Sequence, residues 1–397
     1  MKRYDVIIIG AGASGLMCAA EALKRGRSVL ILERADKAGK KILISGGGRC
    51  NFTNLYTTPD NYLSQNPHFC KSALSRYTPW DFLALMEKHQ LSWEEKQQGQ
   101  LFCQQKAPAV LAMLLKECQQ ADLHVQEEVM EIAYQSNDET YQVTTNQGQY
   151  QAPSLVVATG GASIPKMGAT DFALQVARQF RLKTLGFKPA LVPFTFTQDE
   201  IDRYFKGLSG VSFTAEVSTD AMSFTDQVLI THRGLSGPAI LQISSYWQKG
   251  QVVSLNLLPE MDVASYLSEA QQTQGKVQLK TLLSEHLPKQ LAQRLIQTLG
   301  QASWLECPLG AINTKALSAF GEQLNQWQLT PSGTEGMRTA EVCLGGVDTD
   351  AIDSKTLQAK TQPGLYFIGE ALDVSGQLGG FNFQWAWASG WAAGQSV

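Results

Sequence analysis

The chain lacks three features that would place it in well-known functional classes. Its seven cysteines are scattered and include no Cys-x-x-Cys pair, which excludes the adjacent redox pair of a thioredoxin-reductase-like enzyme. The formal net charge of −3 provides no global basic field, so the composition argues against nucleic acid or an anionic membrane as a partner. No apolar run approaches the roughly 18 residues that a membrane-spanning helix needs. We therefore expect a cytoplasmic protein with reduced thiols, no membrane contact, no nucleic-acid partner and no metal site; the oligomeric state is left open.

What the chain does have is an apolar strand that stops at a glycine cluster. Residues 4–9 lead into Gly10, Gly12 and Gly15, and a helix-forming stretch follows. Gly10 permits a tight turn, Gly12 lets a pyrophosphate approach the backbone, and Gly15 lets the helix and the strand pack closely. The free N–H groups and the positive dipole end of the helix then face the phosphates. This pattern predicts a dinucleotide-binding site.

An acidic residue completes this pattern at the required spacing. A second predicted strand, 28–32, ends in Glu33, about twenty residues beyond the glycines. Its carboxylate can accept hydrogen bonds from a ribose diol and would repel a 2′-phosphate. No second fingerprint of this kind occurs, so a separate NADPH domain is not expected. If the bound dinucleotide takes part in a redox reaction, a nicotinamide would have to dock transiently, or another electron donor must serve.

A basic, glycine-rich stretch, residues 39–54, is a second candidate for lining the ligand. Its three successive glycines offer unobstructed N–H groups, and Lys40, Lys41 and Arg49 add charge suited to a diphosphate or an anionic ring. A flexible surface loop is the alternative interpretation. Cys50 lies within this stretch, directly after Arg49, and could serve as a covalent attachment point or as a substrate thiol.

The C-terminal part repeats the opening arrangement. An apolar strand, 364–368, ends in Gly369 and Glu370, and the glycine-rich residues 376–380 lead into another helix. The helix N-terminus calls for an electron-rich group nearby. We expect Glu370 to bind ribityl hydroxyls of a flavin and the amides of residues 380–382 to lie near its pyrimidine edge.

The order of the remaining patterns predicts the architecture. Between the two glycine-rich ends come helices at 79–86 and 108–120 and strands at 124–134, 141–145, 149–152 and 155–158. Short strands follow at 191–197, 211–218, 226–231 and 252–258, and a helical, leucine-rich region spans 262–328. We predict an α/β protein with a Rossmann-like, glutathione-reductase-type domain, formed by 1–190 and 344–397. A small β-barrel (191–261 and 329–343) and a helical subdomain (262–328) are inserted in it.

Five sequence blocks together resemble a known family. They are LISGGGRCNFTN, ATGGASIPKMGATD, HRGLSGPAIL, LGGVD and LYFIGEALDVSGQLGGFNFQWAWASG, and they resemble the BaiN/YhiN-type NAD(P)/FAD-dependent oxidoreductases over essentially the whole chain. The resemblance implies FAD as cofactor, with Val129 and the pair Thr159 and Gly160 among its contacts. It also implies reduction of carbon–carbon double bonds in ketosteroid-like compounds. Wider FAD-enzyme families usually have Asp where this chain has Glu370, so the role of that residue is less secure than that of the glycines.

The patterns and the resemblance together give one set of expected FAD-binding positions. They are Gly10, Gly12, Ala13, Ser14, Gly15, Glu33, Arg34, Lys40, Lys41, Ser45, Gly46, Gly47, Arg49, Asn51, Val129, Thr159, Gly160, Gly369, Glu370, Gly379, Gly380, Phe381, Asn382 and Phe383.

Three further residues are candidates for catalysis. Arg233 or Arg338 could polarise the carbonyl of a conjugated acceptor, and His232 could supply the proton. We expect an FAD-dependent oxidoreductase that passes hydride through flavin N5, from NAD(P)H to an unsaturated small molecule. Two alternatives remain: an FAD-dependent RNA-modifying enzyme and a flavin-binding regulator without turnover.

Overall fold

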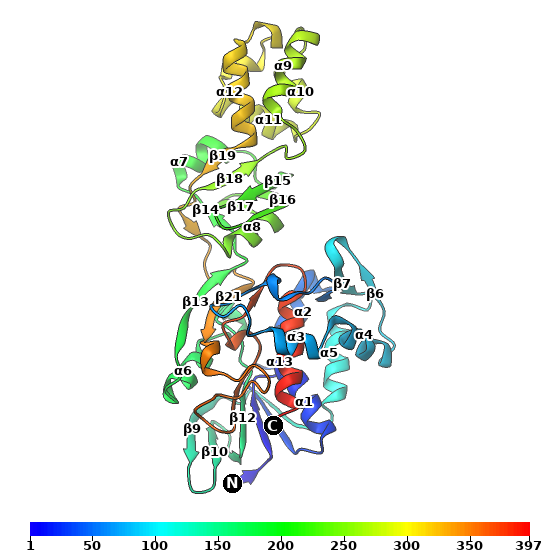
Figure 1. Ribbon diagram of the computed structural model, residues 1–397, viewed down its shortest axis with the longest axis vertical. Helices are drawn as coiled ribbons and strands as arrows, with labels where there is room; N and C mark the ends of the chain where they lie inside the picture. Colours follow the sequence, from blue (N-terminus) through cyan, green and yellow to red (C-terminus); the bar gives the residue numbers. More distant parts are fainter. The chain divides into compact units, whose positions relative to one another are not determined.

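The computed structural model describes residues 1–397 and divides into two compact units. Unit 1 comprises Met1–Lys188 and Val342–Val397, and unit 2 comprises Pro189–Glu341. In Figure 1 the blue and red ends of the chain both lie in unit 1. Unit 1 is therefore built from two separate stretches of sequence, and unit 2 is inserted between them.

A five-stranded parallel sheet forms the centre of unit 1. Its strands, in spatial order, are β22 (Leu365–Phe367), β12 (Ser154–Val157), β2 (Val6–Ile9), β3 (Val29–Glu33) and β8 (Asp122–Val125). All four neighbouring pairs are parallel. The side chains of β2 are buried throughout, as expected of a strand that is covered on both faces. The predicted α/β sheet is confirmed, and its first and last strands in the sequence lie on either side of β12.

Two helices that are far apart in the sequence pack together in unit 1. Helix α1 (Ala13–Lys24) follows β2, and α13 (Phe381–Gly394) lies beside it (Figure 1). A Cβ atom at Gly390 would lie 2.5 Å from the Ser14 carbonyl oxygen, and one at Gly394 would lie 2.5 Å from the Glu21 Cβ. The two glycines thus let the backbones of α1 and α13 approach each other closely.

A second sheet in unit 1 corrects one predicted strand. The sheet contains β1 (Lys2–Arg3), β11 (Gln149–Ala152), β10 (Thr140–Thr145) and β9 (Val129–Gln135). The single strand predicted for 124–134 is wrong, because its residues belong to β8 in one sheet and β9 in another. The break occurs at Gln126, whose φ of 57° is left-handed and whose N–H donates to the Ala35 carbonyl at 2.8 Å.

A third, small sheet of unit 1 follows the basic glycine-rich stretch. It consists of β4 (Asn51–Asn54), β7 (Gln100–Cys103) and β6 (Trp93–Glu95). The stretch itself contains a helix, α2 (Lys40–Gly48), which the sequence analysis did not predict. Its helical dihedral angles end before Ser45, and Gly46 and Gly47 are left-handed.

Unit 2 combines an antiparallel sheet with a group of helices. The sheet runs, in spatial order, through β19 (Trp327–Leu329), β18 (Val253–Asn256), β15 (Ser212–Ser218), β16 (Ser223–Thr231), β17 (Gly234–Ser236), β14 (Phe194–Thr195) and β20 (Gly333–Thr334). The helices are α7 (Gln198–Glu200), α8 (Pro238–Ser244), α9 (Val263–Thr273), α10 (Leu279–Leu283), α11 (Lys289–Thr298) and α12 (Thr314–Asn325). Leu279, Leu283, Leu287, Leu291 and Leu295 of the leucine stripe are all buried in a core shared with the sheet. These leucines, which recur every fourth residue, therefore contribute to packing.

The remaining helices and strands of unit 1 surround these sheets. They are α3 (Lys71–Arg76), α4 (Pro79–Lys88), α5 (Lys106–Glu117), α6 (Phe172–Gln179), β5 (Tyr62–Leu63), β13 (Thr184–Ala190), β21 (Val342–Val347) and β23 (Ser375–Gly376). None of the helices is both long enough and apolar enough to cross a membrane.

The predicted start of α4 allows a direct test of local stability. The Asp81 carboxylate accepts hydrogen bonds from the N–H and the hydroxyl of Thr78, both at 2.6 Å. Thr78→Ala should lower the free energy of unfolding by about 1 kcal/mol, measured by urea denaturation, because the hydroxyl's part in this cap is lost while the backbone N–H bond is kept. Ser75→Ala, an exposed change in α3, is the control and should have little effect. Equal effects of the two changes would contradict the capping role.

Candidate functional site

Four predicted segments meet at one edge of the parallel sheet. The ends of β2, β12 and β22 are in register, since Val157 pairs with both Ile9 and Phe367. Because parallel strands share one carboxyl edge, the residues that follow them emerge side by side. The structure thereby brings Gly10, Glu33, Thr159 and Gly369 to the same edge.

The glycines of the first turn differ in what surrounds them. Gly10 has a φ of 109°, and a Cβ atom there would lie 2.5 Å from the Ala158 carbonyl oxygen. A Cβ atom at Gly15 would lie 2.0 Å from the Gly10 carbonyl oxygen. Gly12 has a φ of −86°, and a Cβ atom there would meet nothing within 4 Å. Packing therefore requires glycine at positions 10 and 15, whereas Gly12 borders open space.

The start of α1 presents unsatisfied backbone donors at this open space. Gly12 is the N-cap of α1 and provides no side chain that could accept a hydrogen bond. Helical hydrogen bonding begins with the Leu16 N–H, which donates to Gly12 O at 3.0 Å, so the amides of Ala13, Ser14 and Gly15 precede the first helical bond. Such a terminus favours an anion.

Glu33 ties the glycine turn to the strand beside it. One carboxylate oxygen accepts from the Ala11 N–H at 2.9 Å and the other from the Ala35 N–H at 2.8 Å. The next residue, Arg34, donates to Glu128 Oε1 and to the Gly168 carbonyl, both at 3.2 Å. Because Val129 follows Glu128, it lies at the same corner as Arg34.

Two residues that were predicted separately form an ion pair. Lys41 Nζ lies 3.0 Å from Glu370 Oε2 and donates to the Ser163 hydroxyl at 2.8 Å. The other Glu370 oxygen accepts from the Cys343 N–H at 2.8 Å. Near these groups the buried Thr159 hydroxyl has no hydrogen-bond partner. Lys40 points elsewhere, because its Nζ lies 2.6 Å from the Asp36 carboxylate.

The start of α13 packs against β4. A Cβ atom at Gly380 would lie 2.4 Å from the Thr53 carbonyl oxygen, and Asn54 Nδ2 donates to Gly379 O at 3.0 Å. With its amide oxygen turned toward α13, Asn51 accepts from the Gly380 N–H at 3.3 Å. Asn54 was not among the expected residues, although the NFTN segment, with two amides in one short strand, was a usable signal.

The side chains at the start of α13 are engaged within the protein. Phe381 packs edge-on against Tyr62, and the Phe383 ring stacks on Trp387. The Asn382 amide bonds both backbone groups of Gly376, at 2.8 and 2.7 Å. At these positions only backbone groups are left for a ligand.

The turn between α2 and β4 is shaped by its glycines and by Phe102. A Cβ atom at Gly46 would lie 2.9 Å from the Phe102 ring, so this left-handed position also has no room for a side chain. The exposed Arg49 guanidinium lies 5.2 Å from the centroid of the same ring. The Ser45 hydroxyl donates to Ile42 O at 2.7 Å and closes the last turn of α2.

The Cys50 thiol is not suited to nucleophilic chemistry. It is buried, and burial raises its pKa to about 12. The reactive thiolate form is therefore scarce at neutral pH. The geometry opposes both alternatives considered for Cys50, covalent attachment and a substrate thiol.

The three candidate catalytic residues lie in unit 2, where His232 and Arg233 share one turn and Arg338 lies in a separate segment. His232 and Arg233 are exposed in the turn between β16 and β17, where the Arg233 carbonyl accepts from the Phe196 N–H at 3.1 Å. Arg338 is exposed in a segment whose ends bond to Pro193 and Leu191. The two arginines thus attach to opposite ends of β14. Their catalytic roles stay a prediction.

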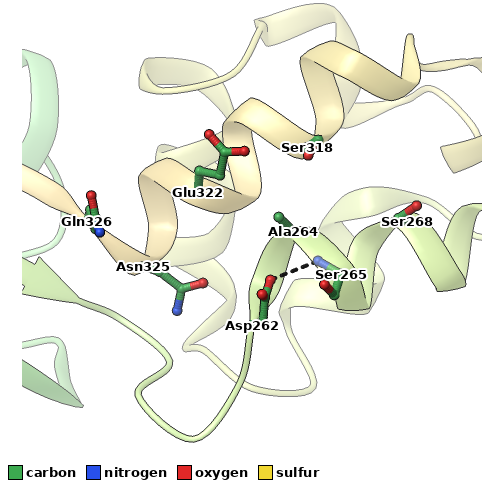
Figure 2. A pocket seen from close by; sticks show the side chains of 8 residues that line it. All are labelled: Asp262, Ala264, Ser265, Ser268, Ser318, Glu322, Asn325 and Gln326. Carbon is green, nitrogen blue, oxygen red and sulfur yellow. Dashed lines mark hydrogen bonds between the residues drawn. The ribbon is translucent and has the colours of Figure 1, made fainter.

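Unit 2 also contains a hollow that the sequence analysis did not predict. It has a volume of about 640 Å³ and lies between α9 and α12. Figure 2 shows its lining, with Asp262 bonded to the Ser265 N–H at 2.9 Å and Glu322 on the opposing helix. Asp262 serves as the N-cap of α9. Because the two charged side chains of the lining are carboxylates, the hollow has the wrong sign for a phosphate group.

Comparison with known proteins identifies the family of the chain. A family model described as HI0933-like protein Rossmann domain matches residues 4–396. The chain belongs to this family. The Rossmann-type fold and the resemblance stated from the motifs are both confirmed by this match.

Three relatives of this HI0933-like protein match over nearly their full length. A protein of Escherichia coli (strain K12) named ribosomal RNA dihydrouridine synthase is 48% identical over 401 residues, which cover 100% of this chain and 98% of that protein. A Haemophilus influenzae protein of the same name is 46% identical, covering 100% and 99% of the two chains. The 3-dehydro-bile acid delta(4,6)-reductase of Clostridium scindens is 29% identical, covering 98% of each chain.

These relatives correct the expectation that no nucleic acid is involved. Two HI0933-like relatives that match over the full length carry a name that specifies ribosomal RNA. The expectation was drawn from a net charge of −3. Net charge is a sum over the whole chain and says nothing of where the charges lie on the surface.

The different surroundings of Gly12 and Gly15 lead to a stability prediction. Gly15→Ala should lower the free energy of unfolding of the ligand-free protein by about 3 kcal/mol, because the new Cβ atom overlaps the Gly10 carbonyl. Gly12→Ala should lower it by no more than about 1 kcal/mol, the usual cost of alanine at a helix N-cap. Chemical denaturation of both variants measures the difference. Equal losses would contradict the assignment of Gly15 to packing and Gly12 to open space.

Proposed function

We propose that the protein is an FAD-dependent reductase that converts uridine in ribosomal RNA to dihydrouridine. The observation that carries this proposal is full-length similarity, at 48% and 46% identity, to two bacterial proteins with that name. A cytoplasmic location, where ribosomal RNA is found in bacteria, is part of the proposal. The relative named as a bile acid reductase is more distant, at 29% identity.

Dihydrouridine formation and the reduction of a conjugated steroid pose the same chemical problem. The 5,6-double bond of uracil is conjugated with the carbonyl at C4, so a hydride adds at C6 and a proton at C5. In the balanced reaction uridine, NAD(P)H and a proton give dihydrouridine and NAD(P)⁺. FAD, when bound, would supply hydride transfer through its N5, and a transiently docked nicotinamide would be the source of the electrons. The protein must orient the base, stabilise charge on the carbonyl oxygen and provide the proton.

The carboxyl edge of the sheet in unit 1 fits a dinucleotide of this kind. The amides of Ala13 to Gly15 would bind the pyrophosphate, which would lie in the open space beside Gly12. Glu33 would bind the adenosine ribose while it keeps its backbone bonds. Three observations support the fit: the open space at Gly12, the uncapped start of α1, and a buried hydroxyl without a partner at Thr159.

The same edge offers groups for the flavin half. Lys41, Glu370 and Thr159 would bind the ribityl and phosphate oxygens, and the Lys41–Glu370 pair at 3.0 Å would open to share its bonds with the ligand. The amides from Gly379 to Asn382 would face the pyrimidine edge of the ring. The Phe381 side chain is buried and Phe383 is partly buried against Trp387, so backbone groups would make most of these contacts.

The direct test is to measure dihydrouridine formation on unmodified RNA. Purified protein should convert uridine to dihydrouridine in ribosomal RNA transcribed in vitro, with NAD(P)H consumed in equal amount under anaerobic conditions. Nucleoside mass spectrometry after digestion measures the product. The Gly12→Ala protein, which we expect to lack flavin, is the control and should give no product. Reduction of a 3-keto-enone steroid without any dihydrouridine formation would contradict the proposal.

A further inference from the structure

One large aromatic side chain stands exposed beside the start of α13. Tyr56, two residues after β4, is 64% exposed. Part of its ring rests on Gly99, where a Cβ atom would lie 2.7 Å from Tyr56 Cδ2. Gly99 has a φ of 74° and ends the short turn Gln97–Gly99 between β6 and β7. The ring is therefore seated on backbone while most of its surface faces solvent.

A buried asparagine, Asn54, links the Tyr56 backbone to Gly379, just before the start of α13. Asn54 is 1% exposed, and its Oδ1 accepts from the Tyr56 N–H at 2.9 Å. Its Nδ2 donates to two carbonyls, those of Gln98 and Gly379, both at 3.0 Å. The Asn54 side chain thus connects three segments. They are the turn at Tyr56, the turn at Gln98 before β7, and Gly379 before the start of α13. Tyr56 is held beside the place where the flavin ring is proposed to lie.

Two cations lie over a second aromatic ring of the same small sheet, that of Phe102. The Arg49 guanidinium and the Lys96 ammonium lie 5.2 and 4.8 Å from the centroid of the Phe102 ring, on the strand β7 that pairs with β4. Lys96 pairs with Glu94 at 3.1 Å, whereas Arg49 forms no ion pair. Unit 2, by contrast, has 10 lysine and arginine residues against 14 aspartate and glutamate residues. The excess of carboxylates makes unit 2 a poor match for the phosphates of an RNA strand, whereas Arg49 of unit 1 is a cation without an ion pair.

We propose that Tyr56 is a stacking platform for a base of single-stranded RNA next to the target uridine, with Arg49 contacting a phosphate of the same strand. The proposal rests on the proposed function. The acceptor double bond lies within the base, so the target uridine must leave its stack to reach a flavin, and its neighbours are unstacked with it. An aromatic ring beside the site replaces the lost stacking, and a cation neutralises the backbone. Asn54 acts as a positioning residue for this platform.

Substitution of Tyr56 tests the platform. Tyr56→Ala should bind ribosomal RNA transcribed in vitro roughly 5- to 150-fold more weakly, the range expected for one lost base–aromatic stack. Tyr56→Phe should bind like the parent protein, because the ring is kept. Trp80→Ala removes an aromatic side chain that is 66% exposed on α4 and serves as the matched control, which should also bind like the parent. Flavin absorbance and a thermal melt of each variant confirm that the cofactor site and the fold are intact.

Several results would overturn the platform. The first is RNA binding by Tyr56→Ala that matches the parent protein. The second is RNA binding by Tyr56→Phe that is as weak as that of Tyr56→Ala. The third is a loss of RNA affinity in Trp80→Ala as large as that in Tyr56→Ala. Failure of the proposed function is distinguishable from these. If RNA binding depends on the Tyr56 ring but no dihydrouridine forms, the platform stands and the reaction fails. If Tyr56→Ala binds RNA and forms dihydrouridine as the parent does, the platform fails and the reaction stands.

Discussion

Close packing of backbone at the carboxyl edge of the parallel sheet is the constraint on which the rest of unit 1 depends. Gly10 and Gly15 have no room for a side chain, because the turn is pressed between the end of β12 and the start of α1. The same need for close approach recurs at Gly380, which lies against β4, and at Gly390, which lies against α1. Segments from both ends of the sequence are thereby held around one edge. Gly12 stands apart from them, since its neighbourhood is open.

This arrangement explains how one scaffold suits relatives that are named for different substrates. A ribosomal RNA dihydrouridine synthase and a bile acid delta(4,6)-reductase both match the chain over nearly its full length. Both names describe reduction of a double bond, and under the proposed function a bound flavin would supply the hydride in either case. The choice of substrate must then come from surfaces next to the flavin. The Asn54–Tyr56 turn, built on β4 and tied to Gly379, is the surface that we propose for this choice.

Local patterns predicted the parts of the fold that depend on local chemistry. The glycine spacing after β2, the acid at the end of β3 and the start of α4 at Pro79 each have a short sequence signature, and each is found where it was expected. The break at Gln126 was missed because the strand pattern continues through it, and only its bond to Ala35 shows that the chain changes sheets. Helix α2 was missed because only five residues have helical angles, and the glycines that follow them are typical of a loop.

Long-range pairing and charge distribution could not be predicted in this way. Lys41 and Glu370 lie 329 positions apart and carry no local sign of their pairing. The Asn54 side chain has hydrogen-bond partners in three segments, and the NFTN motif alone does not predict which residues they are. The net charge of −3 led to a wrong expectation about nucleic acid, because it averages an acidic insert with the rest of the chain. The pairing of distant groups is a property of the fold and becomes visible only when the segments are assembled.

A crystal structure of the protein with FAD bound measures the central claim most directly. The claim predicts pyrophosphate oxygens that accept hydrogen bonds from the amides at the start of α1, beside Gly12. It also predicts an isoalloxazine ring whose pyrimidine edge faces the amides from Gly379 to Asn382. An FAD molecule bound elsewhere, with the space at Gly12 filled only by solvent, would contradict it.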